Sequence, residues 1–170
     1  IQSYLNQDFE GESEMVILND SPIVQYDIGE SVVGNKHIQI INHPTRFSSI
    51  GKKLEFGMKS CVGEYVLRLD DDDILMPNAL SLIQTWIGED PTYDVYRASK
   101  FYWFNNNNYN DVREGINTGN TLSRAYINRI NFPDKNADED LDIVFSPGVK
   151  MKTVESPPCI MIYRYGNSTY

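Results

Sequence analysis

The sequence predicts an α/β fold, in which a mostly parallel sheet is covered by helices on both faces. Two observations support this prediction. Short apolar strands alternate with helix-like segments through the first half of the chain, an order that is typical of parallel sheets. In addition, four aspartates at 70–73 directly follow one of these strands, and open α/β sheets bind ligands outside the carboxyl ends of their strands.

The first elements are short and end in polar turns. The opening IQSYLNQ is helix-like and has no strand before it, so we expect the sequence to be part of a longer chain. Residues 14–18 (EMVIL) predict a buried strand that ends in the turn cluster 19–22. Residues 38–41 (IQII) predict a second strand, which the polar NHPT closes.

Two helices flank the strand that leads to the aspartates. Apolar side chains recur at helical spacing over 48–61, where either of two serines can serve as the N-cap. Residues 64–69 (EYVLRL) predict the strand itself. The next helix is expected to start with Pro77 at its first position, and Gly88 is suited to close it.

The second half has irregular spacing and predicts an appended mixed region. Residues 93–104 (YDVYRASKFYWF) indicate one long strand, and the polar stretch 105–115 indicates a hairpin or a mobile loop. A short amphipathic helix is expected over 122–130, and a late strand over 159–165.

Composition limits the function classes. The 170 residues fit a single domain, 1–170, and 24 acidic against 15 basic residues give a net charge of −9. This balance argues against a general nucleic-acid binder, which needs a basic surface. Cys61 and Cys159 are expected to be reduced core thiols. We find neither a signal peptide nor an apolar stretch long enough for a transmembrane segment.

The four aspartates pose an electrostatic problem, because two unit charges about 6 Å apart repel by roughly 0.7 kcal/mol even in water. On an extended backbone Asp70 and Asp72 would face one way, and Asp71 and Asp73 the other. One such pair would suit Mg²⁺ or Mn²⁺, with substrate phosphates completing the shell. The alternative is a solvated acidic turn. A calcium loop fits poorly, because its glycine and glutamate positions hold other residues.

The segment GEYVLRLDDDDILMPNAL (63–80) closely resembles nucleotide-sugar glycosyltransferases of family 2. Their pattern is Gly-Glu-Tyr, an apolar strand, Asp-x-Asp-Asp, two apolar residues, then Pro and a helix. Three further segments are similar in the same order: 3–22 to the first helix and second strand, 48–66 to the helix over the nucleotide, and 137–145 to the Glu-Asp motif.

The resemblance implies a GT-A, Rossmann-like fold. Residues 1–92 would form the nucleotide-binding half, and 93–170 the half that holds the acceptor and the catalytic base. The chain departs from the family pattern in places: Asp-Asp-Gly-Ser becomes Asn-Asp-Ser-Pro at 19–22, and Glu55 stands where an asparagine is often found.

The resemblance also implies roles in binding the nucleotide. Asp20 would contact the nucleobase, and Lys53 the base or a phosphate. Asp72 would bind the Mn²⁺ or Mg²⁺ ion that bridges the diphosphate. Asp70 would bind the ribose or the same ion, and Asp71 would make a further contact with the nucleotide. For Asp20 a simple turn or helix cap is an equally open interpretation.

Asp140 would be the general base that takes the proton of the acceptor hydroxyl, and Glu139 would support it or touch the acceptor. This reaction needs Asp140 and Asp72 to face one cleft. The alternative interpretation of 138–142 is a helix start, where acidic residues are favoured by the helix dipole.

The implied partners are a nucleotide-diphosphate sugar, a UDP-sugar by family frequency, and a glycan or other hydroxyl acceptor. The implied location is the cytoplasm or the inner face of the membrane, where glycans are assembled. Two alternatives stay open. One is a haloacid-dehalogenase-like phosphatase, with Asp70 as nucleophile and Asp72 as general acid. The other is an inactive transferase-like binding module.

Overall fold

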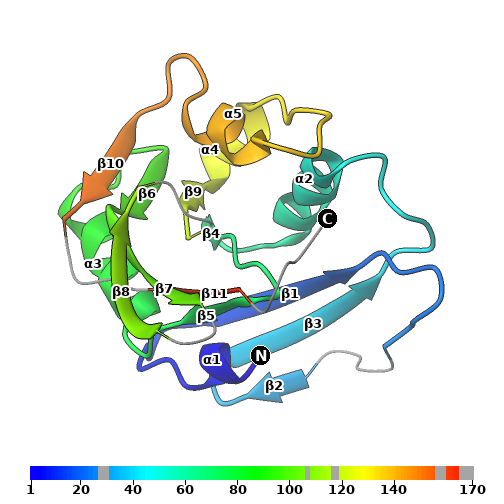
Figure 1. The fold of residues 1–170 in the computed structure, drawn as a ribbon, viewed down its shortest axis with the longest axis horizontal. Helices are drawn as coiled ribbons and strands as arrows, with labels where there is room; N and C mark the ends of the chain where they lie inside the picture. Colours follow the sequence, from blue (N-terminus) through cyan, green and yellow to red (C-terminus); the bar gives the residue numbers. More distant parts are fainter. Residues whose placement is uncertain (27–30, 106–107, 116–118, 156–159, 165–170) are drawn as a thin grey trace. The chain divides into compact units, whose positions relative to one another are not determined.

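The computed structural model describes residues 1–26, 31–105, 108–115, 119–155 and 160–164 (Figure 1). The chain divides into two units. Unit 1 comprises Ile1–Phe9, Leu67–Leu122 and Val149–Tyr170, and unit 2 comprises Glu10–Val66 and Ser123–Gly148. Each unit therefore takes residues from both halves of the sequence.

Unit 2 contains a three-stranded sheet with the order β1-β3-β2. Strands β1 (Ser13–Asn19) and β3 (Lys36–Asn42) confirm the two predicted strands and run parallel, side by side in Figure 1. Strand β1 is half-buried along its whole length, however, and not buried as predicted. The short β2 (Ser31–Val33) is antiparallel to β3. Because β1 and β3 are parallel and in register, both end at the same edge of the sheet, with Asn19 opposite Asn42.

Among the described residues of unit 2 there are also three helices. They are α2 (Ile50–Ser60), α4 (Arg124–Arg129) and α5 (Glu139–Val144). Helix α2 begins as predicted, because the side chain of Ser49 caps it and accepts a hydrogen bond from the N–H of Lys52 at 3.2 Å. At the other end of α2, the guanidinium of Arg124 donates hydrogen bonds to the carbonyl oxygens of Met58, Cys61 and Gly63. These bonds satisfy carbonyls that a helix end leaves without partners.

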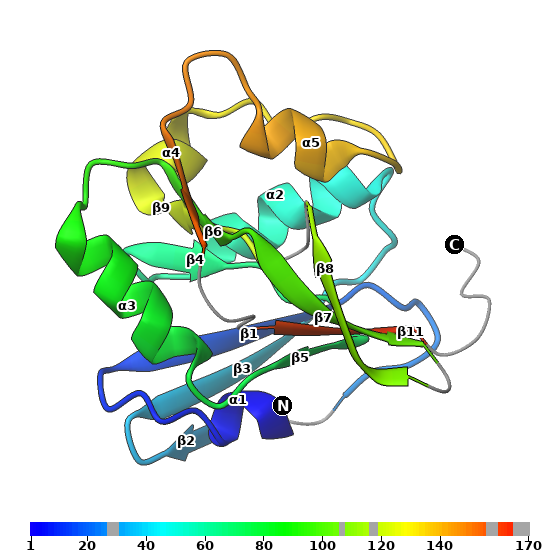
Figure 2. The ribbon, with the colours of Figure 1, turned by 60° about the vertical axis from the view of Figure 1, so that its left-hand side comes forward.

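Unit 1 begins with α1 (Gln2–Leu5), which confirms the helix-like opening. One sheet has the order β5-β11-β7-β8, and Figure 2 shows β11 beside β7 and the β7–β8 hairpin. Its strands are β5 (Asp73–Leu75), β7 (Lys100–Asn105), β8 (Asn108–Glu114) and β11 (Ile160–Arg164). The hairpin and the late strand are thus confirmed.

The second sheet that unit 1 contributes to has the order β10-β6-β9-β4. Its strands are β4 (Tyr65–Leu67), β6 (Val95–Ala98), β9 (Thr121–Ser123) and β10 (Met151–Val154). The chain passes from one unit to the other within β4 and β9. Helix α3 (Ala79–Glu89) buries Ala79, Ile83 and Trp86. It starts after Pro77 and includes Gly88, so both predicted ends were slightly wrong.

The prediction of one mostly parallel sheet was wrong in its extent, because the described strands form three small sheets that mix parallel and antiparallel pairs. The predicted long strand 93–104 is also two strands, β6 and β7, in different sheets. Ser99 lies at the break. Its N–H donates to the carbonyl of Val154, and its carbonyl accepts from the N–H of Gly115, so the hydrogen-bonding partner changes at this residue.

Two smaller predictions can be compared with the structure. Cys61 is a free, half-buried thiol, and burial, with a smaller effect from Glu14, raises its pKa to about 11. Cys159 lies outside the described residues. Within the described ranges, none of the helices has the length and apolar character that crossing a bilayer requires.

Candidate functional site

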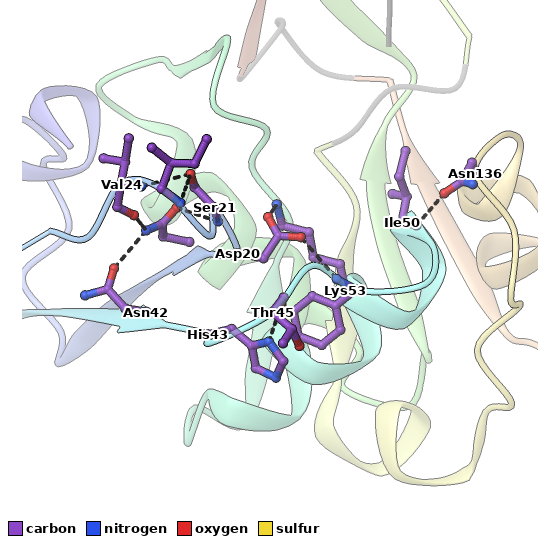
Figure 3. Close-up of polar contacts among 12 residues, drawn as sticks. Asp20, Ser21, Val24, Asn42, His43, Thr45, Ile50, Lys53 and Asn136 are labelled. Carbon is purple, nitrogen blue, oxygen red and sulfur yellow. Dashed lines mark hydrogen bonds and ion pairs between the residues drawn. The ribbon is translucent and has the colours of Figure 1, made fainter.

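The carboxyl ends of β1 and β3 carry a network of asparagine side chains in unit 2 (Figure 3). Asn19 donates from Nδ2 to Oδ1 of Asn42 at 2.8 Å, and also to the carbonyl of Val24 at 2.7 Å. The N–H of Ser21 donates to Oδ1 of Asn19 at 3.1 Å, which forms an Asx turn. The asparagines therefore fold the loop that follows β1 against the end of β3.

Asp20 is held by this loop and points toward α2, where it pairs with Lys53 (Figure 3). The distance from Lys53 Nζ to Asp20 Oδ1 is 2.7 Å, and the N–H of Phe47 lies 3.4 Å from Oδ2. Partial burial alone would raise the pKa of Asp20, but the hydrogen bond and charge of Lys53, with the N–H of Phe47, outweigh it and lower the pKa. Two residues that the sequence assigned separately to the nucleotide thus form one ion pair.

The aspartates of unit 1 form a turn and not an extended strand. The N–H of Asp73 donates to the carbonyl of Asp70 at 3.1 Å, which closes a β-turn. Asp71 and Asp72 are exposed at its corner, whereas Asp73 is 7 % exposed and begins β5. The predicted alternation of side chains along 70–73 was therefore wrong, because it assumed an extended backbone.

Arg68 is a residue that the sequence reasoning missed. Its Nε donates to Oδ1 of Asp70 at 2.9 Å and a terminal nitrogen donates to Oδ2 at 3.2 Å, a two-pronged ion pair. The Arg68 side chain is only 12 % exposed. A signal was present, because an arginine two positions before an aspartate run is near enough in sequence to pair with it. The cation that relieves part of the repulsion is thus supplied by the chain itself.

Asp71 and Asp72 are the carboxylates best suited to a divalent cation. Both are exposed, while both oxygens of Asp70 bind Arg68. No cluster of three or more metal-binding side chains occurs within the described parts of the chain. One or two carboxylates nevertheless fit Mg²⁺ or Mn²⁺, which keep several waters and take substrate phosphates as further ligands.

The predicted base and its neighbour lie in the first turn of α5 in unit 2. Glu139 is 6 % exposed and Asp140 is half-buried. Asp138, the N-cap, has a φ of 55°. The short helix is anchored by Tyr126, whose hydroxyl donates to the carbonyl of Ile143. Both predicted catalytic carboxylates therefore lie in the first turn of α5, a position where acidic residues are common in helices.

A shallow groove of about 440 Å³ runs along α2, and its lining residues are Phe47, Lys52, Glu55, Phe56, Lys59 and Ser60. Glu55 stands where the family often has an asparagine. Its carboxylate pairs with Lys59 at 2.7 Å and with Lys52 at 2.9 Å, and these hydrogen bonds lower its pKa. The side chain of Glu55 is therefore already engaged by two lysines of its own helix.

Solved structures show what fold the chain has. With S. aureus TarS 1–349 in complex with UDP-GlcNAc, the TM-score is 0.74 at 20% identity, over 99% of this chain and 56% of that one. With the UDP complex the TM-score is 0.69 at 18% identity, over 94% and 54%. With the structure of TarS the TM-score is 0.71 at 18% identity, over 96% and 33%. The fold is α/β and GT-A-like.

The sequence assigns the family. The chain belongs to glycosyl transferase family 2, because the model of that family, described as "Glycosyl transferase family 2", matches residues 1–149. No match was found among curated proteins. The chain spans about half the length of the TarS 1–349 structures that it matches. The predicted family is thus confirmed, and the phosphatase alternative has no support.

Proposed function

We propose that this protein transfers a sugar from a UDP-sugar to the hydroxyl of a glycan or other acceptor, with a divalent cation and with inversion at the sugar carbon. The observation that carries the proposal is the family match over residues 1–149, which includes every predicted site residue. TarS, which has a similar fold, was crystallised with UDP and with UDP-GlcNAc, and this supports a uridine donor. The proposed location is the cytoplasm or the inner membrane face.

In this proposal, residues 1–92 bind the nucleotide. Asp20 accepts a hydrogen bond from the nucleobase. Its pKa is lowered, so it is ionised at neutral pH and can only accept hydrogen bonds, which suits the N–H edge of uracil. Lys53 holds the carboxylate in place through its 2.7 Å contact and adds positive charge on the same side.

Asp72, with Asp71 beside it, would hold Mn²⁺ or Mg²⁺ in contact with the diphosphate. The ion would stabilise the charge that develops on the leaving nucleoside diphosphate. Asp70 has a different part, because Arg68 already engages both of its oxygens. It keeps the turn in shape and reaches the ribose only by sharing its carboxylate with Arg68.

Residues 93–170 contain the base. Asp140 takes the proton of the acceptor hydroxyl while the acceptor oxygen forms a bond to the anomeric carbon of the sugar. The bond from that carbon to the phosphate oxygen breaks, and the nucleoside diphosphate leaves with the electron pair. A single displacement of this kind inverts the configuration at carbon. Glu139, buried beside Asp140, supports the base or contacts the acceptor.

The test is a titration of the protein with UDP, GDP and TDP, each with and without Mn²⁺, for the wild type and for Asp72→Ala. We expect the wild type to bind UDP best and to bind it more tightly with Mn²⁺. Asp72→Ala should lose this dependence on the ion, whereas Asp111→Asn, an exposed control in β8, should keep it. Equal UDP affinity with and without Mn²⁺ in the wild type would contradict the proposed role of the ion.

A further inference from the structure

Four residues that connect α4 to α5 make close contact with the start of α2. We call Pro133, Asp134, Lys135 and Asn136 the clamp segment. The N–H of Ile50 donates to Oδ1 of Asn136 at 2.9 Å, which Figure 3 shows, and the N–H of Gly51 donates to the carbonyl of Lys135 at 3.1 Å. Together with the Ser49 cap, these contacts satisfy the first N–H groups of α2.

The absence of a side chain at Gly51 allows this close approach. A Cβ atom at Gly51 would lie 1.8 Å from the carbonyl oxygen of Pro133, far closer than atoms can approach. Gly57 lies in the same helix, and a Cβ there would meet only the side chain of Leu18 at 3.6 Å, an ordinary contact. The need for glycine is therefore specific to the clamp segment and is not a general feature of α2.

The clamp segment is also joined to α5. Nζ of Lys135 lies 2.6 Å from Oδ2 of Asp142, in the first turn of α5. Asn136 is three residues before Glu139, and the intervening Asp138 caps the helix with a positive φ. Little free chain is left between the contact with α2 and the carboxylates of α5, so the two helices cannot shift independently.

We propose that Asn136 is a positioning residue, which sets the place of Glu139 and Asp140 through the hydrogen bond to α2. Helix α2 carries Lys53, the partner of Asp20, so the clamp segment ties the predicted nucleotide contact of unit 2 to the predicted base. Arg124 fixes the other end of α2. Helix α2 thus stays in place when Asn136 is changed, and α5 is the part that moves. This inference rests on the proposed function for its kinetic consequence only.

The test compares Asn136→Ala with Asn136→Asp and with Asn131→Ala, an exposed loop control five residues earlier. In the intact protein, we expect Asn136→Ala to lower kcat about tenfold or more while UDP affinity stays within about twofold. Asn136→Asp should recover most of kcat, because it keeps an acceptor oxygen at the start of α2. Asn131→Ala should match the wild type.

Hydrogen exchange supplies a readout that does not need activity. In Asn136→Ala, we expect the amides of Ile50 and of 139–144 to exchange about tenfold faster, with 52–60 and β1 unchanged. Unchanged exchange in α5 would overturn the inference, and so would a parallel loss of kcat and UDP affinity. If the wild type transfers no sugar at all, the proposed function fails, and the exchange experiment still decides whether the clamp segment holds α5.

Discussion

Replacing Gly51 by alanine measures how tightly the clamp segment packs against α2. The new Cβ would lie 1.8 Å from the carbonyl oxygen of Pro133, so the segment must retreat by roughly 1.5 Å to reach ordinary contact distance. That movement breaks the hydrogen bonds of Ile50 and Gly51, each of which contributes about 1 kcal/mol. Overpacking adds about 1–3 kcal/mol, and the better helix propensity of alanine returns up to about 1 kcal/mol.

The expected net loss in the free energy of unfolding is therefore about 2–5 kcal/mol. Urea unfolding at neutral pH measures it, with Gly57→Ala as the matched control in the same helix. The control should be neutral or gain up to about 1 kcal/mol, because its Cβ meets only Leu18 at 3.6 Å. If the two variants unfold within about 0.5 kcal/mol of each other, the contact between Gly51 and the clamp segment does not hold in solution.

Three further predictions concern single side chains. Arg68→Met should lower the free energy of unfolding, measured in urea, by about 1–2 kcal/mol, because the half-buried Asp70 loses a two-pronged partner. Lys100→Met, which breaks an exposed ion pair, should cost under about 0.5 kcal/mol. An equal cost for both variants would refute a stabilising role for the Arg68–Asp70 pair. Above the ordinary carboxyl pKa of 3.8, Asp20→Asn should have a lower free energy of unfolding than the wild type. This difference should disappear as the pH falls through the lowered pKa of Asp20. A difference that stays constant from pH 7 to pH 2 would contradict the ion pair with Lys53. Cys61, with a pKa of about 11, should be alkylated at pH 8 far more slowly in the folded protein than in urea. Mass spectrometry of the peptide that contains Cys61 measures both rates. Equal rates would show that the thiol is not buried.

The local elements of unit 2 could be predicted from the sequence. Strands β1 and β3 are short apolar runs bounded by turn residues, and α2 has both helical periodicity and a serine N-cap. These signals are encoded within a few residues, so tertiary contacts do not overrule them. The pairing of the strands is not encoded locally. This is why one parallel sheet was predicted where three small mixed sheets occur.

In the candidate site, too, the residues could be predicted from the sequence but their contacts could not. The types of residue at 20, 53, 70–72 and 139–140 could be recognised, because family motifs are contiguous in sequence. Their partners could not, since Lys53 and Asp20 are 33 positions apart, and Ile50 and Asn136 are 86 apart. The turn at 70–73 was predictable in principle, because aspartate favours turns, but the run was interpreted as an extension of the strand.

The most direct test of the proposed reaction separates chemistry from binding at Asp140. Wild type and Asp140→Asn are assayed for transfer from a UDP-sugar to a hydroxyl acceptor, and their affinities for UDP with Mn²⁺ are measured in parallel. The proposal predicts that Asp140→Asn loses transfer by about a hundredfold or more while its affinity for UDP is nearly unchanged. Equal losses of both, or full activity in the variant, would contradict the assignment of Asp140 as the base.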